Sequence, residues 1–254
     1  MLISMRGFIA ALVMLPGLMS TPVFAGEVRV AVASNFAAPM ENIAALFKQE
    51  SGHTLKVTSA SSGKLYTQIS SGTAFDVFLS ADEEMPKRLI RDGAAVGGSR
   101  FVYATGRLAL WSAQTDFVDD KGAVLNKGNF DKLAIPNPRF SPYGIAAKET
   151  LEKLTMWNAV QRKLTKGEDV VQTYQMAATE KVDLAIIALS QIMRDGNIAG
   201  GSWWLVPSVM HNPIRQSAVL LSGAKDSTAA LAFLAFLKSD KAKKVIFSFG
   251  YEVP

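Results

Sequence analysis

Small hydroxyl and amide side chains recur where strand-like segments give way to helix-like segments. They lie in residues 33–36, 59–63, 137–144 and 167–170. The first turn of a helix carries unpaired main-chain N–H groups and a partial positive charge, so it suits an anion. Each serine at such a turn is also compatible with ordinary helix capping. It is the repetition of these turns that favours a small oxyanion site built without arginine.

The hydrophobic pattern predicts the elements that would carry these turns. Predicted strands cover residues 27–33, 54–59, 75–79, 107–112, 132–135, 183–188, 203–206 and 214–221. Predicted helices cover residues 39–49, 64–70, 83–91, 143–154, 169–178, 227–238 and 241–249. Alternation of strand and helix is typical of parallel sheets, whose ligands bind beyond the carboxyl ends of the strands. We therefore expect an α/β protein of two closely joined lobes.

The N-terminal segment has the features of a secretory signal peptide. Arg6 precedes an apolar run at residues 8–19, and small residues at Val23 and Ala25 suit cleavage after Ala25. The run is shorter than the roughly 20 residues that a membrane-spanning helix needs. We therefore predict an exported, periplasmic protein whose residues 1–25 are removed.

The composition excludes several kinds of chemistry. The 254 residues include no cysteine and two histidines, His53 and His211, so disulfides and thiolate chemistry are absent. Removal of Arg6 with the signal peptide lowers the formal net charge from +5 to +4. The basic residues are scattered, which argues against a nucleic-acid partner. The acidic cluster 82–84 fits a solvated helix start better than a metal site. We expect neither a cofactor nor a bound metal cation.

One short motif leaves an enzymatic alternative open. Ser61 and Lys64 match the S-x-x-K pattern of penicillin-recognising serine hydrolases. The companion motifs S-D-N and K-T-G are absent, as are G-x-S-x-G and a P-loop. We favour a binding protein, with no enzymatic activity, over a hydrolase that uses Ser61 and Lys64. A binding protein for another oxyanion, such as sulfate, is the nearer alternative.

Taken in order, several segments resemble the periplasmic molybdate-binding proteins of ABC transporters. The resemblance rests on residues 30–36, 60–65, 75–82, 137–144, 168–170, 185–190 and 249–251. It implies a two-lobed periplasmic-binding-protein fold of type II, with a mostly parallel sheet and flanking helices in each lobe and two hinge crossings. Residues 26–104 and 212–254 would form one lobe, and residues 105–211 the other.

The resemblance also implies a ligand and a set of contacts. Molybdate or tungstate would be held by Ser34, Asn35, Ser62, Tyr143 and Val170. Val170 can offer only its main-chain N–H, whereas Tyr143 marks the branch of the family with a site tyrosine at this position. The implied partner is an ABC transporter permease with its cytoplasmic ATPase, and the receptor would act as a monomer.

Overall fold

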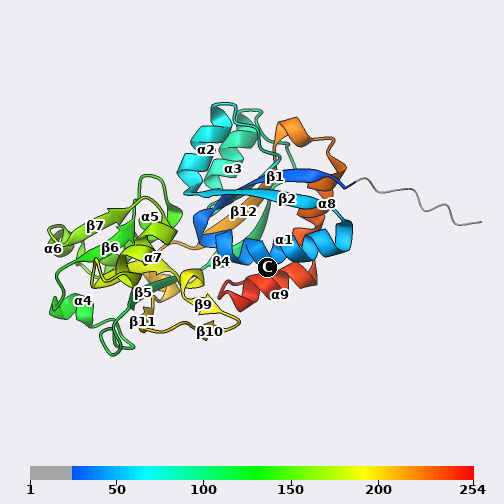
Figure 1. Cartoon of the computed structure of the whole chain (residues 1–254). Helices are drawn as coiled ribbons and strands as arrows, with labels where there is room; N and C mark the ends of the chain where they lie inside the picture. The colour runs from blue at the N-terminus through cyan, green and yellow to red at the C-terminus, as the bar shows by residue number, and fades with distance from the viewer. Residues whose placement is uncertain (1–24) are drawn as a thin grey trace, which may run out of the picture.

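The computed structural model describes residues 25–254, which form two lobes side by side (Figure 1). Each lobe is built on a five-stranded sheet, with the strand order β2-β1-β3-β12-β4 in lobe 1 and β11-β5-β8-β6-β7 in lobe 2. The predicted signal peptide lies outside the described residues, apart from Ala25. Among residues 25–254, no helix is both long enough and apolar enough to cross a membrane.

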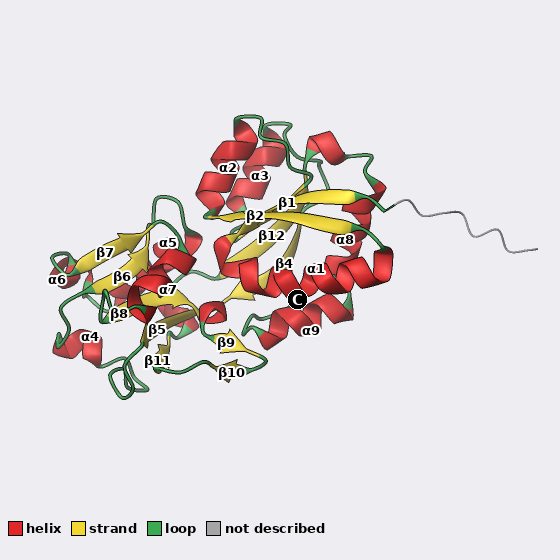
Figure 2. Cartoon of the chain, viewed as in Figure 1, coloured by secondary structure: helices red, strands yellow, loops and turns green. Residues whose placement is uncertain are grey.

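Lobe 1 contains both ends of the described chain. Its strands are β1 (Glu27–Ala33), β2 (Thr54–Ala60), β3 (Val77–Ser80), β4 (Phe101–Gly106) and β12 (Ile214–Leu220). Its helices are η1 (Ser34–Phe36), α1 (Ala37–Ser51), α2 (Ser62–Ser70), α3 (Glu84–Arg91), η4 (Ser222–Ala224), α8 (Thr228–Leu237) and α9 (Asp240–Ser248). Figure 2 shows helices covering both faces of this sheet.

Lobe 2 is formed by the middle of the chain. Its sheet strands are β5 (Leu108–Ser112), β6 (Leu133–Pro136), β7 (Leu164–Gly167), β8 (Leu184–Ala188) and β11 (Ser202–Leu205). Its helices are α4 (Val124–Lys127), α5 (Pro142–Lys153), α6 (Trp157–Val160), α7 (Val170–Ala178), η2 (Leu189–Gln191) and η3 (Ser208–Met210). A short hairpin of β9 (Met193–Arg194) and β10 (Asn197–Ile198) completes it.

Both sheets are mixed, and their parallel strands set the position of the site. β1 runs parallel to β2 and β3, and β6 runs parallel to β7 and β8, whereas the remaining pairs are antiparallel. Parallel strands end at the same edge of a sheet. The turns that lead into η1 and α2 therefore share one edge of lobe 1.

Burial follows the strand and helix patterns of the sequence. In β1, Val28, Val30 and Val32 are fully buried and pack with Phe47 and Phe233 of the helices that cover one face of the sheet. Alternate residues of a strand face opposite sides, so Ala31 packs instead in the cluster of α2 and α3 on the other face. The apolar sequence of β1 is thus explained by burial on both faces.

The lobes are in direct contact, with two chain crossings between them. One crossing lies between β4 and β5, and the other lies between β11 and β12. Gly63 donates its main-chain N–H to the Phe140 carbonyl oxygen across the lobes at 2.9 Å. The β9–β10 hairpin reaches α9, where the Gly196 N–H donates to the Ser248 carbonyl oxygen at 2.9 Å. The structure is therefore a closed form of a two-lobed protein.

The predicted elements agree with the structure to within a few residues, and some elements were not predicted. β4, β7, the β9–β10 hairpin and the short helices α4 and α6 are additional. His53 is buried, and its Nδ1 accepts the Gly26 N–H at 2.9 Å. Trp204 is buried while Trp203 is half-exposed, as expected for neighbours on a strand.

Candidate functional site

The helical turn η1 presents the first two predicted ligand residues. Ser34 and Asn35 directly follow β1 and are both buried. The Ser34 hydroxyl has no hydrogen-bond partner within residues 25–254. The Asn35 side chain is already engaged, because its Nδ2 donates to Gln216 Oε1 at 2.8 Å and to the Tyr251 hydroxyl at 3.0 Å. Of Asn35, only the main-chain N–H is therefore left to serve a ligand, beside the hydroxyl of Ser34.

The N-terminus of α2 presents two buried hydroxyls of different character. Ser62 Oγ accepts the Ala81 N–H at 2.9 Å, and its own proton has no acceptor within residues 25–254. Ser61 Oγ, one residue earlier, is sealed from solvent and has no partner at all among the described residues. A buried hydroxyl without a partner is uncommon in proteins, and it marks this turn as a place for a ligand.

Lobe 2 contributes Tyr143 and Val170 at two further helix starts. Tyr143 is 1% exposed, and its hydroxyl accepts a hydrogen bond from Gln216 Nε2 at 3.0 Å. Val170 is the first residue of α7, behind Asp169, whose side chain caps the helix by accepting the Gln172 N–H at 2.9 Å. The cap therefore leaves the Val170 N–H without a partner in the described chain.

The structure brings these turns together where the lobes meet. Tyr143 and Val170 pack in one apolar cluster with Ala33, which precedes Ser34, and with Ala81, which binds Ser62. α7 also lies against η1. Residues adjacent to Ser34 and bonded to Ser62 in lobe 1 thus belong to the same buried cluster as Tyr143 and Val170 of lobe 2. The free groups of the predicted contact residues are hydroxyls and main-chain N–H groups, the donors that suit an oxyanion.

A buried hydrogen-bond network behind this region was not predicted from the sequence. It joins Asn35 and Gln216 to Tyr103, Ser190 and Tyr251. Burial raises the pKa of Tyr103 and Tyr143 well above the ordinary phenol value, and it raises the pKa of Tyr251 to about 12. The three phenols therefore remain protonated. The only sequence signals for the network were the segments 185–190 and 249–251.

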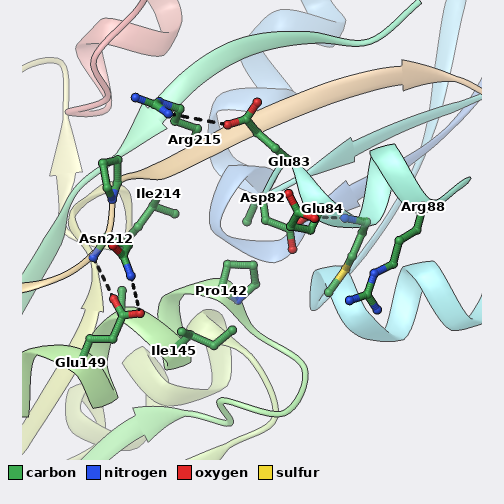
Figure 3. Close-up of a pocket in the computed structure, with 14 residues that line it drawn as sticks. Asp82, Glu83, Glu84, Arg88, Pro142, Ile145, Glu149, Asn212, Ile214 and Arg215 are labelled. Carbon is green, nitrogen blue, oxygen red and sulfur yellow. Dashed lines mark hydrogen bonds and ion pairs between the residues drawn. The ribbon is translucent and has the colours of Figure 1, made fainter. Parts of the chain in front are cut away.

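A neighbouring cavity of about 440 Å³ also lies between the lobes (Figure 3). Its walls carry four carboxylates, from Asp82, Glu83, Glu84 and Glu149, against the guanidinium groups of Arg88 and Arg215. Burial raises the pKa of Asp82. Such a surplus of carboxylates repels an anion. The residues that line this cavity include none of the five predicted contact residues, although Ala81 and Pro142 adjoin Ser62 and Tyr143.

The arrangement of Lys64 bears on the hydrolase alternative. Its ammonium group pairs with Glu168 across the lobes, and both side chains are largely exposed. No hydrogen bond joins Lys64 to Ser61 within residues 25–254. A serine nucleophile needs an adjacent base, and the S-x-x-K pattern does not assemble one here.

Comparisons with known proteins place the chain among solute-binding proteins. A family model described as bacterial extracellular solute-binding protein matches residues 28–252. A molybdate-binding protein ModA of Azotobacter vinelandii is 46% identical over 235 residues, covering 92% of this chain and 93% of the relative. A molybdate-binding protein ModA of Rhodobacter capsulatus is 44% identical over 248 residues, covering 98% of this chain and 96% of the relative.

Solved structures agree with this similarity. The periplasmic molybdate-binding protein of Azotobacter vinelandii aligns with a TM-score of 0.87 at 36% identity, covering 89% of this chain and 99% of that chain. The sulfate-binding protein SubI of Mycobacterium tuberculosis aligns with a TM-score of 0.72 at 13% identity, covering 90% of this chain and 87% of that chain. The second likeness concerns the fold alone.

Gly106, at the end of β4, offers a direct test of the site's geometry. A Cβ added there would lie 2.0 Å from the Tyr143 hydroxyl oxygen and 2.7 Å from Gln216 Nε2. We expect Gly106→Ala to displace both groups and to weaken molybdate binding by about tenfold or more, as loss of one hydrogen bond to a charged group would. Isothermal titration calorimetry measures the change.

The matched control for this substitution is Gly223→Ala, because a Cβ at Gly223 meets nothing within 4 Å. We expect the control to bind molybdate as the unmodified chain does. Equal affinity of the Gly106→Ala variant and the control would contradict the placement of Tyr143 in the site.

Proposed function

The chain belongs to the bacterial extracellular solute-binding protein family, and from this premise we propose that it captures molybdate between its two lobes and delivers it to an ABC transporter. The observation that supports the proposal is the set of uncharged donors that both lobes carry at helix starts along their contact, at Ser34, Ser62, Tyr143 and Val170. The similarity to molybdate-binding proteins over nine-tenths of the chain supports the same ligand.

The proposed contacts follow from the chemistry of the ligand. A tetrahedral dianion offers only acceptor oxygens, so it pairs with hydroxyl and main-chain N–H donors. Helix starts add their partial positive charge. We propose that Ser34 and Ser62 bind through their hydroxyls, Tyr143 through its phenol, and Asn35 and Val170 through their main-chain N–H groups. Donors from both lobes would favour the closed form when the ligand is bound.

Size provides the proposed selection between oxyanions. Molybdate and tungstate are nearly equal in size and larger than sulfate, so a cavity fitted to molybdate would accept tungstate. Phosphate carries a proton near neutral pH and would need an acceptor in the site. The free groups among the proposed contacts are hydroxyls and main-chain N–H groups, which donate hydrogen bonds. The neighbouring carboxylate of Asp169 already caps helix α7.

The proposal also covers where the protein acts, with which partner, and how the chain divides into lobes. We propose export to the periplasm by a signal peptide cleaved after Ala25, action as a monomer without enzymatic activity, and release of the ligand to a membrane permease with its ATPase. We also propose a division into residues 26–104 with 212–254 and residues 105–211. The two crossings between the sheets support this division, since they lie close to both boundaries.

The direct test is a titration series with four oxyanions by isothermal titration calorimetry. We expect molybdate and tungstate to bind with similar affinity, sulfate to bind far more weakly, and phosphate to give no measurable heat. Sulfate or phosphate binding as tightly as molybdate would contradict the proposed function.

Substitution of the two serines tests the proposed contacts. Ser34→Ala combined with Ser62→Ala should weaken molybdate binding by about 100-fold or more, since a hydrogen bond to a charged group contributes about 1.5–3 kcal/mol. Ser70→Ala, at the exposed end of the same helix α2, is the control. Unchanged affinity in a folded double variant would show that these hydroxyls do not carry the site.

The pH dependence tests the neutral character of the donors. Burial disfavours phenolate and raises the pKa of Tyr143, so its proton stays in place as the pH rises. We expect a nearly constant molybdate affinity from about pH 6 to about pH 9. A steady loss of affinity toward pH 9 would indicate a cationic donor instead.

A further inference from the structure

The start of α2 makes two contacts with lobe 2 at consecutive residues. The Gly63 N–H donates to the Phe140 carbonyl oxygen at 2.9 Å, and the Lys64 ammonium group pairs with Glu168. Phe140 lies in the turn before α5, and Glu168 lies in the turn before α7. Lobe 2 therefore meets this helix start with the two turns that lead into its own helices α5 and α7.

The Gly63–Phe140 hydrogen bond supplies the cap of a helix from the opposite lobe. The first N–H groups of a helix have no carbonyl partner within the helix, so a cap must satisfy them. Ser61 holds the N-cap position of α2, with the extended main-chain conformation that caps usually adopt (φ −62°, ψ 147°). Yet the Ser61 side chain accepts no hydrogen bond from the helix. The Phe140 carbonyl of lobe 2 takes the place of that cap.

This arrangement leaves the Ser61 hydroxyl in an unfavourable position. The residue is 3% exposed, and its hydroxyl oxygen is sealed from solvent without a hydrogen-bond partner among residues 25–254. A buried hydroxyl without a partner costs free energy, whereas a serine that caps a helix stabilises it. Because the main chain of Ser61 already has cap geometry, rotation of the side chain is all that capping of the Gly63 N–H requires once Phe140 withdraws.

Gly63 suits this contact because it has no side chain. A Cβ at Gly63 would lie 3.0 Å from both the Cα and the carbonyl oxygen of Phe140, which is closer than a side chain usually packs against a main chain. The main chain of Gly63 is helical, and in a helix alanine is more stable than glycine. The glycine at this position is therefore explained by the close approach of lobe 2.

The turn of lobe 2 that carries Phe140 is held by hydrogen bonds of its own. Asn137 Oδ1 accepts the Arg139 N–H at 3.1 Å, and the Asn137 carbonyl oxygen accepts the Phe140 N–H at 3.1 Å. These bonds fix the turn without using the Phe140 carbonyl oxygen, which accepts from Gly63. Lobe 2 thus presents this carbonyl to α2 as a fixed acceptor when the lobes close.

We propose that the start of α2 is a closure switch in which two caps exchange. The Ser61 hydroxyl caps the Gly63 N–H in the open form, and the Phe140 carbonyl oxygen replaces it in the closed form. Ser61 then favours the open form, and Gly63 permits the closed one. The switch sets ligand affinity through the equilibrium between open and closed lobes. The inference rests on the proposed function only in that the ligand favours closure.

Ser61→Ala is the first test, because it removes the cap of the open form and the unpartnered hydroxyl of the closed form. Both changes favour closure, so we expect calorimetry to show molybdate binding about fivefold tighter. A ligand contact of Ser61 would instead weaken molybdate binding, and a cap present in both forms would leave the affinity unchanged. Either of these two results would overturn the inference.

Gly63→Ala should act in the opposite direction, and it keeps the inference testable if Ser61→Ala does not fold. Its Cβ presses on Phe140 in the closed form, while alanine strengthens α2 in the open form. We expect molybdate binding to weaken about fivefold or more, and the ligand-free protein to unfold at a higher temperature. Molybdate affinity equal to that of the unmodified chain, or above it, would contradict the switch.

The population of closed lobes can be measured without any ligand. The chain contains no cysteine, so Ser70→Cys in lobe 1 and Thr179→Cys in lobe 2, both at exposed positions, can carry a pair of spin labels. Pulsed electron spin resonance then gives the distances between the lobes. We expect Ser61→Ala to raise the closed fraction of the ligand-free protein and Gly63→Ala to lower it. Identical distance distributions in the two variants would overturn the proposal.

Each variant has a matched control in lobe 1. Ser227→Ala removes a serine cap whose hydroxyl accepts the Ala230 N–H of α8 at 3.2 Å, and Gly97→Ala adds a Cβ that meets nothing within 4 Å. We expect both controls to keep the affinity and the closed fraction of the unmodified chain, and equal shifts in the controls would overturn the inference. Absence of molybdate binding to the unmodified chain would instead overturn the proposed function, while the spin-label distances would still test the switch.

Discussion

The main-chain carbonyl oxygen of Asn35 is the acceptor on which the polar interior between the lobes depends. It receives the hydroxyls of Ser190 from lobe 2 and of Tyr251 from the C-terminal segment. Buried polar groups must be satisfied together, since each one left without a partner costs about 1–3 kcal/mol. The contact that joins the lobes is therefore also the contact that orients the groups behind the ligand donors.

Several interactions join the two lobes, and some of them are weak. The Lys64–Glu168 pair is largely exposed, and exposed ion pairs contribute at most about 1 kcal/mol. The Gly63–Phe140 hydrogen bond and the Ser190–Asn35 hydrogen bond add two polar contacts across the interface. A ligand that pairs with donors from both lobes contributes free energy of comparable size. Ligand binding is thus well placed to shift the equilibrium toward the closed form.

The fold was largely predictable because burial imposes a visible period on the sequence. β1 and α2 could be found from their apolar residues, and the turns at Ser34 and Ser62 followed from their position after strands. β7 was missed because the edge strand 164–167 is short, and three of its four residues are not buried. β4 was missed because its mixed burial gives no clear alternation. Local sequence carries little information about strands that depend on their neighbours.

The buried hydrogen-bond network behind the predicted contacts could not be predicted, because its members are far apart in the sequence. Asn35 and Gln216 are separated by 181 positions, and a lone glutamine in a strand pattern gives no sign of a bulge. The sequence predicts Asn35 as a contact residue, yet in the structure its side chain turns to the interior while its main-chain N–H is left free. Similarity at the contact positions alone does not determine which group of a residue faces the site, because buried partners such as Gln216 and Tyr251 engage the Asn35 side chain.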